Sequence, residues 1–80
     1  MNWLRLPEIV EHCLRLRGIT TLQDISSDTG IAYQCVRSVF KKQKILTVGI
    51  VGEALATIMN HYNITPEELT SVWVLMKRHS

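Results

Sequence analysis

The segment from Thr21 to Lys41 constrains the fold most, because a glycine separates two short stretches that both have helical spacing. Gly30 can adopt the left-handed backbone conformation that ends a helix and begins a turn, which is costly for most other residues. Upstream, Thr21 and Asp24 have the spacing of a capping box, with an acid three residues after the cap. The sequence therefore predicts two short helices joined by a tight turn at residues 29–31.

The second helix of this pair is predicted to have two different faces. Its apolar residues recur at helical spacing and are Ile31, Val36, Val39 and Phe40. The opposite face is predicted to carry Tyr33, Gln34, Arg37, Ser38 and Lys41. A hydrogen-bonding face with a basic end, on a helix that follows a glycine turn, suits the major groove of DNA. The alternative interpretation is a solvated face in an ordinary helical bundle, where a glycine between helices also occurs.

Five features of this segment resemble the helix-turn-helix of the lambda-repressor/Cro-like family, also called Xre-like. These are the helix cap Thr21, the aliphatic–small pair Ile25-Ser26, the pair Gly30-Ile31, and the aliphatics Val36 and Val39-Phe40. The likeness continues weakly through residues 61–69 into the last helix. The resemblance implies a compact all-α fold of five helices, with the helix-turn-helix formed by the second and third.

The first helix is predicted to open at Pro7 and to stop at Gly18. A longer helix that Asn2 caps, with the proline inside it, remains an alternative. The broad apolar face of this helix is formed by Leu6, Ile9, Val10, Cys13, Leu14 and Leu16.

The fourth helix is predicted to be regular only from about Val51, because glycines weaken any helix just before it. Residues 45–51 are also strand-prone, so a strand is the alternative there. The last helix has the clearest local signal, with Thr65 as its cap, Pro66 at its first position and Glu68 completing the box. It is expected to end near the cations Lys77 and Arg78.

The composition restricts the class of protein. Eighty residues predict a single domain over residues 1–80. Net charge is only +2, yet four cations and no acid lie between Tyr33 and Lys44. Two isolated cysteines favour a reduced, cytoplasmic setting. We expect no leader, membrane span, cofactor, metal site or small-molecule ligand, and the pair His12-Cys13 has no further member that would indicate an enzyme.

Three groups of residues are the candidate sites. For base readout they are Tyr33, Gln34, Arg37 and Ser38, because glutamine pairs with adenine and arginine with guanine. For phosphate contacts they are Thr21, Gln23, Lys41, Lys42 and Lys44. For a dimer interface they are Trp73, Val74 and Leu75, because the last helix has more apolar surface than a small core needs.

These expectations describe a sequence-specific regulator that binds double-stranded DNA as a homodimer. By resemblance it would be a Cro-type repressor of a phage, prophage or plasmid, although an activator uses the same contacts. The rival interpretation is a protein-interaction module of the same fold, of the antitoxin or anti-repressor type. The cations from Arg37 to Lys44 favour DNA.

Overall fold

The structure, a computed structural model, describes residues 6–41 and 48–78 and contains five α-helices and no strand within those ranges. The helices are α1 (Leu6–Leu16), α2 (Leu22–Thr29), α3 (Tyr33–Lys41), α4 (Val48–His61) and α5 (Pro66–Arg78). The predicted all-α class and the five-helix count are therefore confirmed for this part of the chain.

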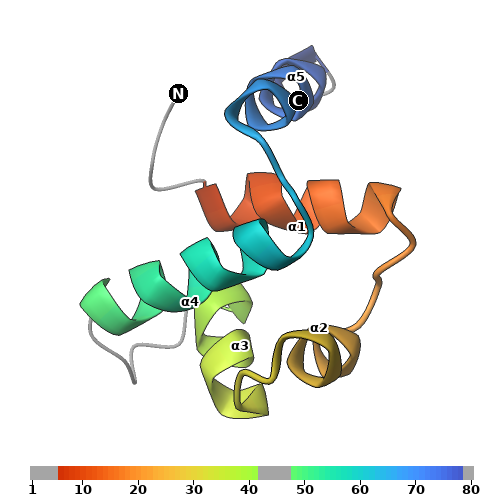
Figure 1. Cartoon of the computed structure of the whole chain (residues 1–80). Helices are drawn as coiled ribbons and strands as arrows, with labels where there is room; N and C mark the ends of the chain where they lie inside the picture. The colour runs from red at the N-terminus through yellow and green to blue at the C-terminus, as the bar shows by residue number, and fades with distance from the viewer. Residues whose placement is uncertain (1–5, 42–47, 79–80) are drawn as a thin grey trace.

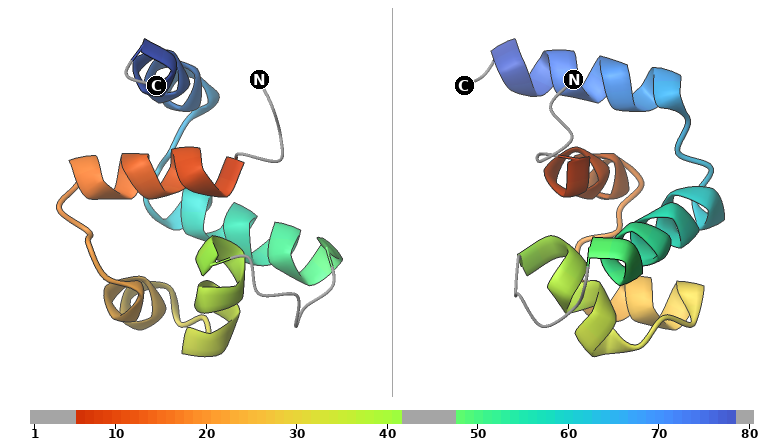
Figure 2. Two further views of the ribbon diagram at one scale, coloured as in Figure 1. Left: turned by 180° about the vertical axis from the view of Figure 1, so that it is seen from behind. Right: turned by 90° about the vertical axis from the view of Figure 1, so that its left-hand side faces the viewer.

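The helices surround one apolar core to which each of them contributes. Its fully buried side chains come chiefly from α1, α3 and α4, and include Ile9, Leu14, Val36, Val39 and Ile58. α1 packs against α5 and α3, while α2 and α3 pack against each other and against α4. As a result α5 lies at one end of the molecule and α2 with α3 at the other, with α1 and α4 between them (Figures 1 and 2).

Two helices end in the same hydrogen-bonded motif. At the end of α1, Gly18 has φ of 82° and the N–H of Ile19 donates to the carbonyl of Leu14 at 2.9 Å. At the end of α4, Asn63 has φ of 55° and the N–H of Ile64 donates to the carbonyl of Met59 at 2.9 Å. In each case the left-handed residue turns the chain so that the next amide satisfies a terminal carbonyl. The predicted stop at Gly18 is confirmed.

The start of α5 follows the prediction only in part. The helix begins at Pro66, and the Thr65 hydroxyl accepts the N–H of Glu68 at 3.2 Å, as expected of a cap. The carboxylate of Glu68, however, does not complete the box, because it binds Arg17, the residue after α1, instead. A charged partner offers a carboxylate a stronger hydrogen bond than a neutral backbone amide does.

The predicted start of the fourth helix is wrong, because α4 begins at Val48 rather than near Val51. The strand alternative is also wrong for residues 48–51, whereas residues 45–47 lie outside the described residues. A glycine inside a helix costs only about 1 kcal/mol relative to alanine. Favourable contacts of the other residues in the helix can outweigh this cost. Gly52 has no heavy atom within 4 Å of where a Cβ would stand, so its place in the helix is not required by close packing.

The apolar face of α1 is shorter than predicted. Leu16 is 71% exposed, although its helical angle places it above Ile9, which is fully buried. Leu16 is the last residue of α1, where the helix extends past the core. Helical spacing predicts the side of the helix on which a residue lies. It does not predict how much of the length of the helix packs against the core. The start of α1 at Leu6 lies next to residues outside the described ranges, which include Asn2.

Candidate functional site

The turn between α2 and α3 is held by several hydrogen bonds. Gly30 has φ of 76°, and its N–H donates to the carbonyl of Ser26 at 2.9 Å. The Ser26 hydroxyl donates to the carbonyl of Ile31 at 2.7 Å, and the Thr29 hydroxyl donates to the carbonyl of Ile25 at 2.7 Å. These bonds pair polar groups of the turn with each other, so the angle between α2 and α3 is set locally. The predicted role of Gly30 is confirmed.

The outward face of α3 carries four polar or charged side chains. Tyr33, Gln34, Arg37 and Lys41 are all exposed, and Tyr33 is 43% exposed. Positions 33, 34, 37 and 41 fall within about 100° of the circumference of an α-helix. The sequence therefore placed these four residues correctly on one exposed face.

Ser38 does not belong to this face, and its predicted place there is wrong. Its side chain is only 4% exposed, and its hydroxyl donates to the carbonyl of Gln34 at 2.9 Å. α3 contacts α1, α2 and α4, so neighbours cover more of its circumference than the apolar residues alone indicate. A serine tolerates this burial because its own helix supplies the acceptor. Ser38 is thus removed from the candidate residues for base contact.

The start of α2 and the end of α3 border the same cavity. This cavity has a volume of about 80 Å³, and its lining includes Thr21, Leu22 and Lys41. Thr21 caps α2, since its hydroxyl accepts the N–H of Asp24 at 3.2 Å, and Gln23 is exposed on the first turn. Three of the candidate phosphate contacts are therefore placed, and two of them lie close together.

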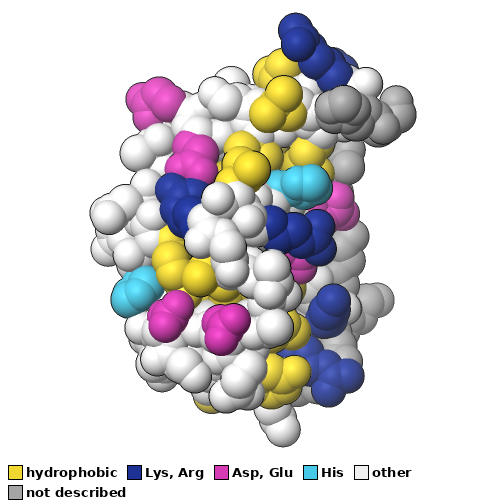
Figure 3. All heavy atoms as spheres, turned by 90° about the vertical axis from the view of Figure 1, so that its right-hand side faces the viewer, with side chains coloured by type: hydrophobic (Ala, Val, Ile, Leu, Met, Phe, Trp, Pro, Cys, Tyr) yellow, Lys and Arg dark blue, Asp and Glu magenta, His cyan; other side chains and the backbone are white. Residues whose placement is uncertain are grey.

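The remaining phosphate candidates, Lys42 and Lys44, lie outside the described residues. Within α2 and α3 the basic side chains are Arg37 and Lys41, both on α3. Lys and Arg side chains at the height of these two helices lie together along one edge of the face in Figure 3. The acids of α2 are Asp24 and Asp28, and the second of these accepts a hydrogen bond from the hydroxyl of Tyr62, which follows α4.

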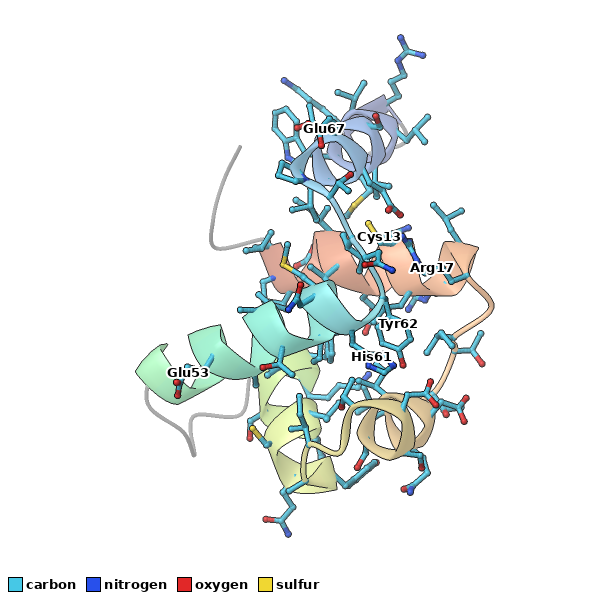
Figure 4. All side chains as sticks on the ribbon, in the orientation of Figure 1. Cys13, Arg17, Glu53, His61, Tyr62 and Glu67 are labelled. Carbon is cyan, nitrogen blue, oxygen red and sulfur yellow. The ribbon has the colours of Figure 1, made fainter. Side chains whose placement is uncertain are left out.

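Arg17 joins the ends of three helices, which the sequence analysis did not predict. Its guanidinium binds both carboxylate oxygens of Glu68 at the start of α5. It also donates to the carbonyl of Tyr62 after α4 at 3.2 Å and to the carbonyl of Cys13 in α1 at 3.1 Å. Figure 4 shows Cys13, Arg17 and Tyr62 gathered where α1, α4 and α5 approach one another. No local pattern indicates the contacts with Tyr62 and Glu68, because these partners are 45 and 51 residues away in the sequence.

Two ionisable groups beside Arg17 have shifted pKa values. The hydrogen bond from Arg17 holds the pKa of Glu68 below its usual value. Burial, and then the nearby charge of Glu68, raise the pKa of the Cys13 thiol to about 11. The thiolate is therefore scarce at neutral pH, and Cys13 packs as a core residue with no exposed surface.

The candidate interface on α5 divides into exposed and packed residues. Val74 is 40% exposed and Leu75 is 50% exposed. Trp73 is half-buried and packs against the core, with the Nζ atom of Lys77 5.2 Å from the centroid of its ring. Of the three residues assigned to an interface, two thus remain open to a partner.

The residues that the structure describes contain neither a metal site nor a membrane-spanning helix. There, no group of three or more histidine, cysteine or acidic side chains is arranged to hold a metal ion. None of the helices in that part of the chain has the length and apolar character needed to cross a membrane. Comparisons with known protein families, curated proteins and solved structures find no match for this chain. The exposed surfaces of α3 and α5 are therefore the features of this chain that bear on its function.

Proposed function

We propose that this protein is a sequence-specific DNA-binding regulator of the lambda-repressor/Cro-like type, in which α2 and α3 form the helix-turn-helix. The observation that carries the proposal is the exposed arc of α3, where Tyr33, Gln34, Arg37 and Lys41 lie on one side. An α-helix fits the width of the major groove, and this arc presents hydrogen-bonding and cationic groups along its length.

Each exposed side chain has a distinct role in this proposal. Gln34 pairs with adenine through its amide, and Arg37 pairs with guanine through two parallel N–H groups. Tyr33 contacts a phosphate or a thymine methyl group, and Lys41 contacts a phosphate. Thr21 and Gln23, at the start of α2, contact the backbone on the same side. The base contacts select the sequence, and the phosphate contacts set the orientation of the helix.

The regulator acts as a homodimer in the cytoplasm. One recognition helix contacts only a few base pairs, so a second copy is needed for useful specificity. The open residues Val74 and Leu75 supply an apolar surface for that copy. Two recognition helices then enter successive major grooves of a palindromic site, and the bound dimer represses by excluding other proteins from it.

The rival function is a protein-interaction module, and the exposed α5 surface is the observation that favours it. In that case Val74 and Leu75 contact a different protein and α3 has a solvated face. Retention on heparin discriminates between the two functions. A DNA-binding protein is retained and released by moderate salt, because its cations replace the counterions of a polyanion.

Selection of bound sites from random duplex DNA tests the proposal. The expected result is a palindromic motif whose half-sites are about 10 base pairs apart, one turn of the double helix. Substitution of Val74→Asp or Leu75→Asp is expected to give a folded monomer that binds the selected site poorly, as sedimentation and circular dichroism would show. Absence of any enriched motif, together with no retention on heparin, would favour the protein-interaction module.

A further inference from the structure

The connection between α2 and α3 is short, and both backbone polar groups of its middle residue bond to side chains of α2. Residues 30–32 separate the two helices (Figure 1). The carbonyl of Ile31 accepts a hydrogen bond from the Ser26 hydroxyl at 2.7 Å, and the N–H of Ile31 donates to the Thr29 hydroxyl oxygen at 3.3 Å. The Thr29 hydroxyl itself donates to the carbonyl of Ile25, so its oxygen is left to act as the acceptor. We call the two bonds to Ile31 the hydroxyl clamp.

The start of α3 has no side-chain cap of its own. α2 and α5 each follow a threonine whose hydroxyl accepts an N–H of the first turn. The corresponding residue before α3 is Ala32, whose methyl group cannot accept a hydrogen bond, although its carbonyl accepts the N–H groups of Cys35 and Val36. A helix without an N-cap side chain has a less firmly held first turn. The hydroxyl clamp therefore restrains the chain at the point where α3 begins.

Burial of apolar side chains does not by itself fix the tilt of α3. Val36 and Val39 are buried, and they determine which face of α3 is turned toward the core. The hydrophobic effect has no preferred direction, whereas a hydrogen bond weakens steeply as its angle departs from linearity. The hydroxyl clamp thus adds a directional restraint at one end of the helix.

A small change of tilt at Ile31 becomes a large displacement at the exposed residues of α3. Arg37 lies six residues further along, about 9 Å by the helical rise, so a tilt of about 10° would move it by about 1.5 Å. Base contacts tolerate much less, because the donor–acceptor distances of hydrogen bonds lie within about 2.7–3.2 Å. The long, flexible side chain of Lys41 can still reach a phosphate. A change of tilt is therefore expected to affect base contacts before phosphate contacts.

We propose that Ser26 and Thr29 are positioning residues, which set the tilt of α3 through Ile31 and thereby control how well the protein discriminates between DNA sequences. Neither side chain contacts DNA in this inference, which rests on the proposed function. The resemblance described above requires only a small residue at position 26, so the hydroxyl there is a feature of this chain in particular.

The first experiment measures binding to the selected site and to random duplex DNA at several salt concentrations. In Ser26→Ala, the ratio of the two affinities is expected to fall about fivefold or more, since a bidentate base contact is worth about 1–3 kcal/mol and 1.4 kcal/mol is tenfold. Affinity for random DNA and the salt slope should match those of the wild type, because the phosphate contacts remain. A variant that was merely less stable would lose both affinities alike.

Three further variants separate the hydroxyl groups from other effects. Ser27→Ala makes the same chemical change at an exposed neighbour in α2 and should leave the ratio of affinities unchanged. Thr29→Val keeps the shape of the side chain without its hydroxyl and should lower the ratio, whereas Thr29→Ser keeps the hydroxyl and should stay near the wild type. Alanine is a better helix former than serine, so Ser26→Ala does not weaken α2 itself. Circular dichroism establishes that every variant is folded.

The second experiment does not use DNA. Residual dipolar couplings, measured by NMR on the free protein, report the angle between α2 and α3. Ser26→Ala and Thr29→Val are expected to change this angle or to broaden its distribution, and Ser27→Ala is not.

Two results would overturn the inference. One is an angle between α2 and α3 that stays the same in both Ser26→Ala and Thr29→Val. The other is a loss of affinity in these variants that is equal on selected and random DNA. If the wild type binds no DNA but the angle changes as expected, the proposed function is overturned, and the positioning of α3 by the hydroxyl clamp stands.

Discussion

Tyr62 and Asp28 connect the end of α4 to α2 through a hydrogen bond, in which the phenolic hydroxyl donates to the Oδ2 atom of the carboxylate at 2.7 Å. Tyr62 follows α4 directly, and its backbone carbonyl accepts a hydrogen bond from Arg17. The same residue thus contacts α2 through its side chain and the residue that follows α1 through its backbone. Tyr62 therefore connects α2, one of the two helices of the proposed helix-turn-helix, to the rest of the molecule.

Replacement of Tyr62→Phe is expected to lower the free energy of unfolding by about 1.5–3 kcal/mol, because it removes a hydrogen bond to a charged group. Burial and the hydrogen bond to Asp28 both raise the pKa of Tyr62. The unfolded chain therefore ionises first as the pH rises above about 10, and the wild type loses stability there. Urea unfolding at neutral and alkaline pH measures both effects. Equal losses of stability in the two proteins at alkaline pH would contradict this role.

Replacement of Glu68→Gln is expected to remove part of the acid sensitivity of the fold. The pKa of Glu68 is lowered in the folded protein, so its stabilising contribution is present above the unfolded value of about 4.3 and is lost as the pH falls through the folded value. Both partners are partly exposed, so we expect a loss of about 1 kcal/mol at pH 7 and less at low pH.

The control for Glu68 is its neighbour Glu67, because Glu67→Gln makes the same change of charge in the same turn without touching Arg17. Chemical unfolding of both variants at dilute concentration separates the contribution of the ion pair to stability from that of the helix dipole. If the two variants lose stability equally at pH 7, the contact with Arg17 contributes nothing measurable.

The two cysteines are expected to differ in reactivity toward a thiol reagent at pH 8. Cys13 has no exposed surface and a pKa raised to about 11, so its thiolate is both scarce and covered. Cys35 is only half-buried and should react first. In a Cys35→Ser variant, modification should become slow and follow the rate of unfolding, whereas Cys13→Ser should keep the fast phase. Fast modification of the Cys35→Ser variant would show that the core around Cys13 opens readily.

Local signals in the sequence predicted the ends of helices well, because a cap or a left-handed residue acts within a few positions. Gly30 and Thr65 are examples, and the exposed face of α3 followed from helical spacing alone. Ser38 was misplaced because spacing within one helix does not reveal how many neighbours cover it. Arg17 was missed because its partners at Tyr62 and Glu68 are brought to it only by the packing of α1, α4 and α5.

The exposed residues of α3 give a prediction that separates sequence recognition from charge. On the selected DNA site, Gln34→Ala and Arg37→Ala should each cost about 1–3 kcal/mol and relax discrimination at particular base pairs. Lys41→Ala should instead weaken binding to all sequences alike, and lower the slope of log affinity against log salt by about one. Titrations of specific and random duplexes at several salt concentrations distinguish the two patterns.

The control for this comparison is Lys77→Ala, which removes the same charge from α5 at the opposite end of the molecule from α3. Its salt slope should match that of the wild type if the contact with phosphate is local to α3. Losses for Gln34→Ala and Arg37→Ala that are equal on specific and random DNA would exclude base readout by these side chains. If Lys41→Ala leaves the salt slope unchanged, Lys41 does not contact a phosphate. Ser38 is buried beside this face, so Ser38→Ala should leave discrimination between sequences unchanged. This variant is therefore a control for the substitutions of the exposed residues of α3.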